Sequence, residues 1–197
     1  EPPWLVEGVI PGSGVSVIFG QPNAGKTFIA LDMALHVAHG VPWFGRRVQQ
    51  RPVVYVGLEG VGGIGKRLKG LILDRFPDLV AKKPELEDTQ ASDMPLRFIL
   101  GEEFRFAVGD DSSVRRLVEA VWGLNLEKPM IIIDTLAMAL VGDENGTEVM
   151  AAVARQAVQL GTQTGGMVVL IHHPSKGNAE SPRGSSALNA AIETSVL

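Results

Sequence analysis

Cysteine is absent from this sequence of 197 residues, and aromatic residues make up only 6% of it. Without thiols the chain can form neither a disulfide nor a thiolate metal site, which is compatible with a reducing compartment. No run approaches the roughly 20 consecutive apolar residues that a membrane helix needs, and the first residues lack the pattern of a secretion signal. We therefore expect a cytoplasmic protein with no membrane partner.

An excess of positive charge is also missing, because the formal net charge is −4. Proteins that coat duplex DNA as monomers are usually basic, since neutralising phosphates supplies most of their non-specific affinity. A nucleic-acid role would therefore need local basic loops, gathered by assembly around a pore. The hydrophobic fraction of 45% is enough for one good core, and the length predicts a single domain over residues 1–197.

Short apolar segments with many β-branched residues alternate with helical patterns along the chain. The segments predicted as buried strands are Val15–Phe19, Pro52–Leu58, Leu96–Leu100, Met130–Asp134 and Met167–Ile171. The segments predicted as helices are Gly25–His39, Gly65–Phe76, Asp110–Trp122 and Thr147–Gln163. Strands that are apolar throughout and alternate with helices predict an α/β fold, with a mostly parallel twisted sheet covered by helices on both faces.

Two segments fall outside this alternation. Residues 77–95 are polar with no clear period, so we expect a surface excursion there. Ser186–Leu197 predicts a short helix running into another strand, and we expect further C-terminal strands to be missing from this chain.

The clearest motif is a phosphate-binding loop, because residues 20–27 fit the pattern G-x-x-x-x-G-K-[ST] between a strand and a helix. Gly20 and Gly25 let the backbone curl so that successive N–H groups point at a phosphate, and the helix N-terminus adds partial positive charge. Lys26 would reach the β- and γ-oxygens, and the Thr27 hydroxyl would be one Mg²⁺ ligand. The predicted cofactors are ATP and Mg²⁺, and the predicted nucleotide-binding residues are Gly20, Gln21, Pro22, Asn23, Ala24, Gly25, Lys26, Thr27 and Phe28.

Two carboxylates follow predicted strands, at the sheet edge where ligands of open α/β folds collect. Asp134 ends an apolar strand beside the phosphate loop, where it could hold Mg²⁺ through water, and we predict it as the second metal-side residue. Glu59 directly follows the second strand and could orient or deprotonate the water that attacks the γ-phosphate. The plainer alternatives stay open: Asp134 as the cap of the next segment, and Glu59 as an exposed loop residue.

The fifth strand runs into two adjacent histidines, which point to opposite faces of a strand and are therefore poor joint metal ligands. We predict His173 as a contact to the γ-phosphate, with a capped loop histidine as the alternative. The following loop is rich in Gly, Asn, Ser and Pro and carries Lys176 as a candidate nucleic-acid contact. Arg183 on this loop could act as an arginine finger on a neighbouring subunit's nucleotide, or it could be a solvated surface residue. The run Asp143-Glu144-Asn145 could be a functional motif, or it could be only a turn and cap before the helix at 147–163, and the sequence favours neither.

In this order, these motifs resemble the RecA-type ATPases of the plasmid RepA group, the hexameric replicative helicases of plasmids and phages. The motifs that carry the resemblance are Gly20–Thr27, Glu59, Ile133-Asp134-Thr135-Leu136, Asp143-Glu144-Asn145, His172-His173-Pro174-Ser175-Lys176 and Arg183-Gly184-Ser185-Ser186.

The resemblance implies a RecA-like core, a homo-hexameric ring with ATP at subunit interfaces, and single-stranded DNA contacted by the loops after Asp134 and after His173. It also implies that Glu59 is the catalytic carboxylate, His173 the γ-phosphate sensor and Arg183 a finger supplied in trans. The alternatives are a RecA-type recombinase or signalling ATPase, and a nucleotide switch without motor activity. A small-molecule kinase is less favoured, because no Arg-rich lid is visible.

Overall fold

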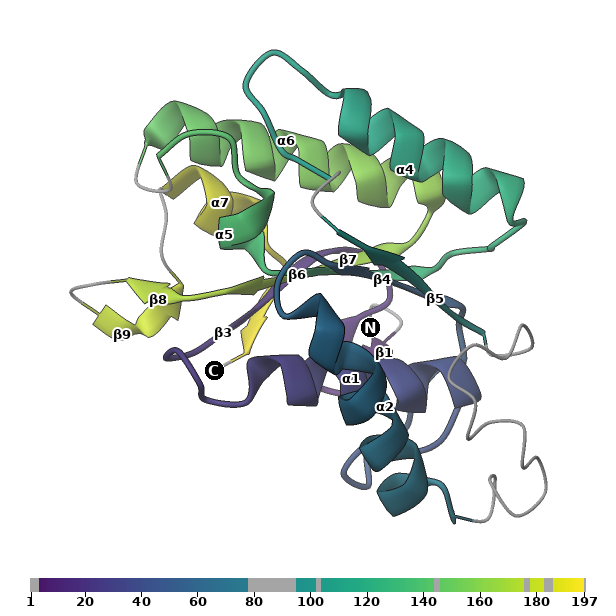
Figure 1. Cartoon of the computed structure of the whole chain (residues 1–197). Helices are drawn as coiled ribbons and strands as arrows, with labels where there is room; N and C mark the ends of the chain where they lie inside the picture. The colour runs from purple at the N-terminus through teal and green to yellow at the C-terminus, as the bar shows by residue number, and fades with distance from the viewer. Residues whose placement is uncertain are drawn as a thin grey trace.

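A six-stranded parallel sheet forms the centre of the fold (Figure 1). The structure is a computed structural model, and it describes residues 4–77, 95–101, 104–143, 146–175, 178–182 and 186–196. Its strands are β3 (Gly14–Phe19), β4 (Val53–Gly57), β5 (Leu96–Leu100), β6 (Met130–Asp134), β7 (Met167–His172) and β10 (Thr194–Val196). They lie in the order β10-β3-β7-β6-β4-β5, and each neighbouring pair runs parallel. The predicted α/β class with a parallel sheet is confirmed.

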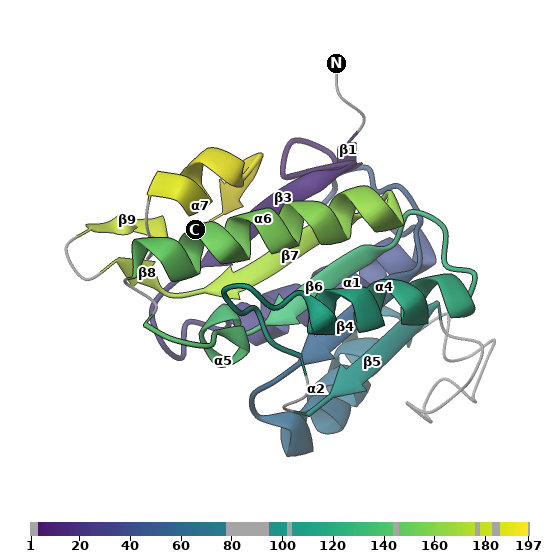
Figure 2. The ribbon, with the colours of Figure 1, turned by 90° about the horizontal axis from the view of Figure 1, so that it is seen from above.

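Helices cover both faces of this sheet, as Figures 1 and 2 show. One face carries α1 (Lys26–His39) and α2 (Val61–Arg75). The other carries α4 (Ser112–Gly123), α5 (Leu136–Ala139), α6 (Thr147–Thr164) and α7 (Ser186–Ala191).

The central strands β3, β4, β6 and β7 contribute to two hydrophobic cores because their side chains alternate between the faces. In β6, Met130 and Ile132 pack with the α1–α2 core, whereas Ile131 and Ile133 pack with the α4–α6 core. All four side chains are fully buried. This double burial explains why the central strands are apolar runs with no polar alternation.

The helix boundaries agree closely with the predicted ones except at α2. This helix begins at Val61, four residues before the predicted start at Gly65. Gly60 adopts a left-handed φ of 61°, which lets the chain turn directly from the strand region into the helix. The three glycines at positions 62, 63 and 65 lower helix propensity and so hide this first turn from sequence patterns.

Sequence patterns also missed several very short elements. β1 (Trp4–Val6) and β2 (Ile10–Pro11) pair antiparallel, and so do β8 (Pro174–Ser175) and β9 (Asn178–Pro182). The β8–β9 hairpin projects beyond the carboxyl end of β7 (Figure 1). The predicted helix and strand near residue 190 are confirmed as α7 and β10, and β10 extends the sheet beside β3. Residues 78–94, most of the predicted excursion, lie outside the described residues.

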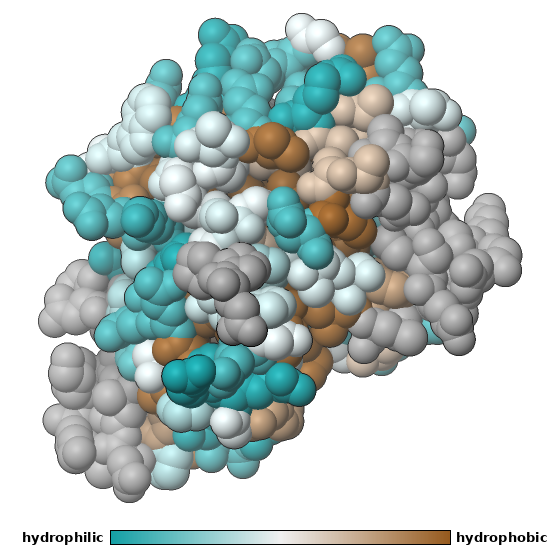
Figure 3. Space-filling model, turned by 180° about the vertical axis from the view of Figure 1, so that it is seen from behind, coloured by the Kyte–Doolittle hydropathy of each residue, from teal (hydrophilic) through white to brown (hydrophobic). Residues whose placement is uncertain are grey.

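The surface mixes polar and apolar side chains. On the face seen from behind, apolar residues form patches separated by hydrophilic ones (Figure 3). None of the helices in the described part of the chain is long and apolar enough to cross a membrane.

Candidate nucleotide site

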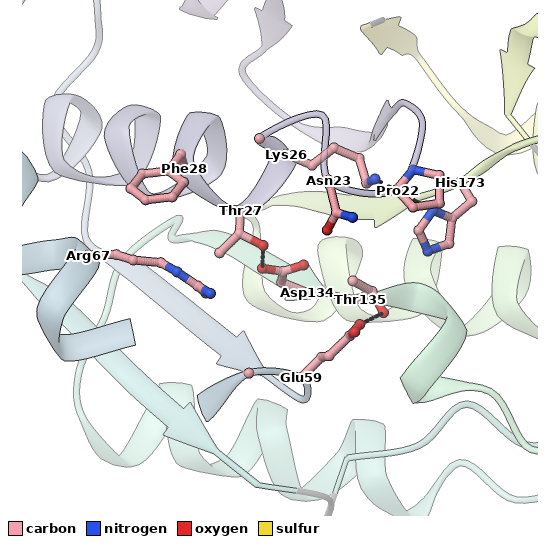
Figure 4. A pocket seen from close by; sticks show the side chains of 12 residues that line it. Pro22, Asn23, Lys26, Thr27, Phe28, Glu59, Arg67, Asp134, Thr135 and His173 are labelled. Carbon is pink, nitrogen blue, oxygen red and sulfur yellow. Dashed lines mark hydrogen bonds between the residues drawn. The ribbon is translucent and has the colours of Figure 1, made fainter. Parts of the chain in front are cut away.

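A cavity of about 330 Å³ opens at the carboxyl end of the sheet, where β3, β4, β6 and β7 lead into loops (Figure 4). Parallel sheets place the ends of several strands along one edge, so residues far apart in sequence meet there. The cavity is lined by Pro22, Asn23, Gly25, Lys26, Thr27, Phe28, Glu59, Gly60, Arg67, Asp134, Thr135 and His173.

The loop between β3 and α1 has the backbone that a phosphate cradle requires. Asn23 and Gly25 both adopt positive φ, at 63° and 84°, so the chain curls sharply before the helix starts at Lys26. No side chain caps this helix, and its first turn carries no acidic residue. The N–H groups at the helix N-terminus, which lack partners within a helix, are therefore available to an anion.

The predicted phosphate-binding lysine folds over this loop. The Lys26 Nζ donates hydrogen bonds to the carbonyl oxygens of Gly20 and Gln21, at 2.8 and 2.9 Å, and lies 3.5 Å from Nδ1 of His173. Partial burial lowers the pKa of the Lys26 ammonium, and the charges of Asp134 and Glu59 oppose that shift. A polyanion in the cavity would replace the carbonyl partners with stronger charge-assisted ones.

Asp134 is the buried centre of the site, with only 2% of its surface exposed. Its Oδ2 accepts hydrogen bonds from Thr27 Oγ1 at 2.8 Å and from the Tyr55 hydroxyl at 2.5 Å. Its Oδ1 is buried and has no hydrogen-bond partner among the described residues. Burial raises the pKa of the Asp134 carboxyl above its usual range, and the bonds from Tyr55 and Thr27 oppose this. Burial and Asp134 itself raise the pKa of the Tyr55 hydroxyl, which therefore stays a donor.

Glu59 stands opposite the phosphate loop at the end of β4. Its side chain is exposed to the cavity, and its Oε2 accepts a hydrogen bond from Thr135 Oγ1 at 3.4 Å. Thr135 directly follows Asp134, so the end of β6 places one acidic group and orients the other.

The two histidines separate as the strand alternation predicts. His172 is fully buried, whereas His173 is partly exposed, lines the cavity and lies beside Lys26. Their ring centroids are 6.5 Å apart. Among the described residues, no group of three or more His, Asp or Glu side chains could hold a metal ion.

Sequence analysis missed Arg67, Tyr55 and Gly60, and it assigned no role to Thr135. Arg67 lies on α2, and its guanidinium carbon is 5.7 Å from the centroid of the Phe28 ring. Its spacing from Gly60 and Gly63 would have placed it on the cavity side of the helix, but the start of α2 was not recognised. Tyr55 looks like an ordinary strand residue, and its bond to Asp134 depends on β4 lying next to β6.

Other predicted residues fall outside the described part of the chain. These are Glu144, Asn145, Lys176, Arg183, Gly184 and Ser185. At the start of α6 the capping residue is Gly146, with no side-chain hydrogen bond. The loop after Asp134 forms the short helix α5, and the chain after His173 enters the β8–β9 hairpin.

Residues 1–179, most of the chain, match a protein family described as the AAA domain. No curated protein matches the chain.

Proposed function

The chain belongs to the AAA domain family and is therefore a nucleotide-binding ATPase domain, and we propose that it hydrolyses Mg²⁺-bound ATP. We further propose, from the resemblance to plasmid replicative helicases, that this hydrolysis drives a ring-shaped motor on single-stranded DNA. The observation that carries the proposal is the cavity itself. It gathers a phosphate loop, a partly buried Thr27–Asp134 pair and an exposed carboxylate, Glu59, around one space.

The cavity residues fit a magnesium ion. Asp134 offers a buried Oδ1 with no hydrogen-bond partner among the described residues, and the Thr27 hydroxyl lies against the same carboxylate. Hydroxyl and carboxylate oxygens suit Mg²⁺, which usually keeps several waters and shares its site with substrate phosphates. We propose that Thr27 holds the ion directly and Asp134 holds it through water. When bound, the ion would neutralise charge on the β- and γ-oxygens.

Lys26 and the N–H groups of the loop would bind the β- and γ-phosphates, and Lys26 would leave its carbonyl partners to do so. Glu59 would take a proton from the attacking water, while Thr135 keeps its carboxylate directed at the cavity. His173, 3.5 Å from Lys26 Nζ, would contact the γ-phosphate and pass its presence to the β8–β9 hairpin that follows.

The ring and the DNA come from the resemblance to plasmid replicative helicases. Arg183 would reach the γ-phosphate of the neighbouring subunit, and the segments after Asp134 and His173 would face the pore. Residues 135–147, after Asp134, contain no Lys or Arg, whereas Lys176 and Arg183 follow His173. With a net charge of −4, we expect DNA binding to depend on the cations after His173 and therefore on assembly.

The test is steady-state ATP hydrolysis at fixed salt, with and without single-stranded DNA, in the wild type, Lys26→Ala and Glu59→Gln. We expect DNA to stimulate the wild type, and this stimulation to fade as salt rises. Lys26→Ala should lose both nucleotide binding and turnover. Glu59→Gln should still bind ATP but turn over roughly 100- to 10,000-fold more slowly, the typical range of a general-base contribution.

Two results would change the proposal in different ways. Hydrolysis that ignores DNA would favour a signalling ATPase or a nucleotide switch at the same site. Full activity in Lys26→Ala would contradict the nucleotide site itself.

A further inference from the structure

An exposed aromatic ring faces the cavity at the first turn of α1. Phe28 is 48% exposed, although a Phe side chain in a helix of this core would normally be buried. The Arg67 guanidinium lies over its ring at 5.7 Å, and both side chains line the cavity. Two flat groups, one aromatic and one cationic, therefore stand together at the cavity wall.

The position of Arg67 is set by α2. Its side chain leans toward the N-terminus of the helix, so that a Cβ built on Gly63 would lie 3.5 Å from the guanidinium carbon. Among the described residues, no carboxylate forms an ion pair with Arg67. Its guanidinium is thus held beside the cavity with a planar face available for stacking.

The cavity has two ends, with the Thr27–Asp134 hydrogen bond between them (Figure 4). Lys26 and His173 lie together at one end, and Phe28 and Arg67 at the other. In a loop of this type the lysine takes the β- and γ-phosphates, while backbone N–H groups cradle the α- and β-phosphates. The nucleoside must therefore extend from the phosphates toward the end of the cavity that lies away from Lys26.

We propose that Phe28 and Arg67 form the platform on which the base of the bound nucleotide stacks. This inference rests on the proposed nucleotide site and adds the part of the ligand that the phosphate motif does not explain. Stacking on a flat platform depends on the area of the base, and every base has such a face. The platform should therefore favour purines over pyrimidines and discriminate little between adenine and guanine.

The experiment compares Mg²⁺-dependent binding of ADP and of pyrophosphate by titration calorimetry, because only ADP carries a base and neither is hydrolysed. Phe28→Ala and Arg67→Ala should each weaken ADP binding roughly 5- to 30-fold. Pyrophosphate affinity should stay within about twofold of the wild type. Phe28→Trp should retain ADP affinity, since it keeps an aromatic face, and CDP should bind the wild type more weakly than ADP or GDP.

Two neighbouring exposed residues outside the cavity give matched controls, Ile29→Ala on α1 and Lys66→Ala on α2. Both should bind ADP like the wild type, and thermal melts should show that all variants are folded. Equal weakening of ADP and pyrophosphate would overturn the platform in favour of a phosphate contact. Unchanged ADP affinity in both alanine variants would also overturn it. Failure of the wild type to bind either ligand would contradict the nucleotide site proposed above.

Discussion

At the scale of single residues, the Asp134 carboxylate has the most demanding environment. Both donors that reach it, Tyr55 and Thr27, bond to the same oxygen, while the other oxygen is buried without a partner among the described residues. Keeping a buried carboxylate ionised costs free energy unless it is fully paired. If Asp134 binds Mg²⁺ as proposed, the free protein is less stable than it could be because this carboxylate is kept ready for the cation.

Asp134→Asn should separate these two effects. We expect the variant to lose ATP hydrolysis, yet to be more stable at pH 7 by about 1 kcal/mol, because the charge is gone and the shape is kept. For a chain of this size that is a rise in melting temperature of about 2–4 °C. Calorimetric melts and hydrolysis assays on the same preparations check both parts, and a lower melting temperature would contradict the explanation.

The stability difference between the wild type and Asp134→Asn should depend on pH. The pKa of Asp134 is raised in the folded state, so the folded protein takes up this proton at a higher pH than the unfolded chain does. As pH falls through that raised pKa toward the ordinary value for Asp, the wild type should gain stability relative to the variant. Denaturant titrations of both proteins at a series of pH values measure this trend, and a gap that widens on acidification would disprove it.

Tyr55→Phe removes the donor that bonds to Asp134 at 2.5 Å. We expect unfolding to become easier by about 1–3 kcal/mol, because the buried carboxylate loses a charge-assisted hydrogen bond. The pKa of Asp134 should rise further, shifting the acidic limb of the hydrolysis profile to higher pH. In an Asp134→Asn background the same change should cost less, and equal costs in both backgrounds would show that the two residues are not coupled.

At the scale of elements, the junction between α6 and β7 sets how closely β6 and β7 approach. A Cβ on Gly166 would lie 2.2 Å from the carbonyl oxygen of Pro129, just before β6. The next residue, Met167, donates its N–H to that same oxygen at 2.9 Å. Gly166 does not have a left-handed φ, so backbone conformation is not the reason for a glycine here. A glycine is needed because the backbones approach too closely to leave room for a Cβ.

Gly166→Ala should therefore destabilise the fold by several kcal/mol, since backbone on both sides must shift. A matched control is Gly70→Ala within α2, where nothing lies within 4 Å of the added Cβ. That change should stabilise by about 0.5–1 kcal/mol, because alanine favours the helix. Denaturant unfolding of both variants tests the contrast, and similar effects would contradict it.

Elements were predictable where a long apolar pattern decides the structure. β5 and β6 have the predicted boundaries, and α1, α4 and α6 differ from the predicted ones by only one or two residues at either end. The strand order was not predictable, because it depends on pairings between distant segments rather than on local pattern. The partnership of Tyr55 with Asp134 follows from that order, and so it too was invisible in the sequence. Arg67 was missed for a local reason, the glycine-rich start of α2.

At the scale of the whole molecule, the proposed ring can be tested by mixing variants. Lys26→Ala subunits would lack a working nucleotide site but keep Arg183, and Arg183→Ala subunits would have the opposite defect. If Arg183 acts on the neighbouring subunit, mixtures should recover a substantial fraction of DNA-stimulated hydrolysis that neither variant has alone. Hydrolysis rates across mixing ratios measure this, and a mixture no more active than its components would argue against a finger in trans.

The order of the strands also has a consequence for how the chain folds during synthesis. β3, which leads into the phosphate loop, pairs with β7 and β10. Gly14 is paired with Met167, and Ser16 with Thr194, so β3 can form these pairs only after residues more than 150 positions later have been synthesised. Contacts of such large sequence separation form slowly, because a long loop must close before they stabilise anything. On the ribosome, the strand nearest the phosphates would remain without its neighbours until the last of these segments emerges. A nascent chain would thus lack a properly formed phosphate loop until the segments that form β7 and β10 have been synthesised.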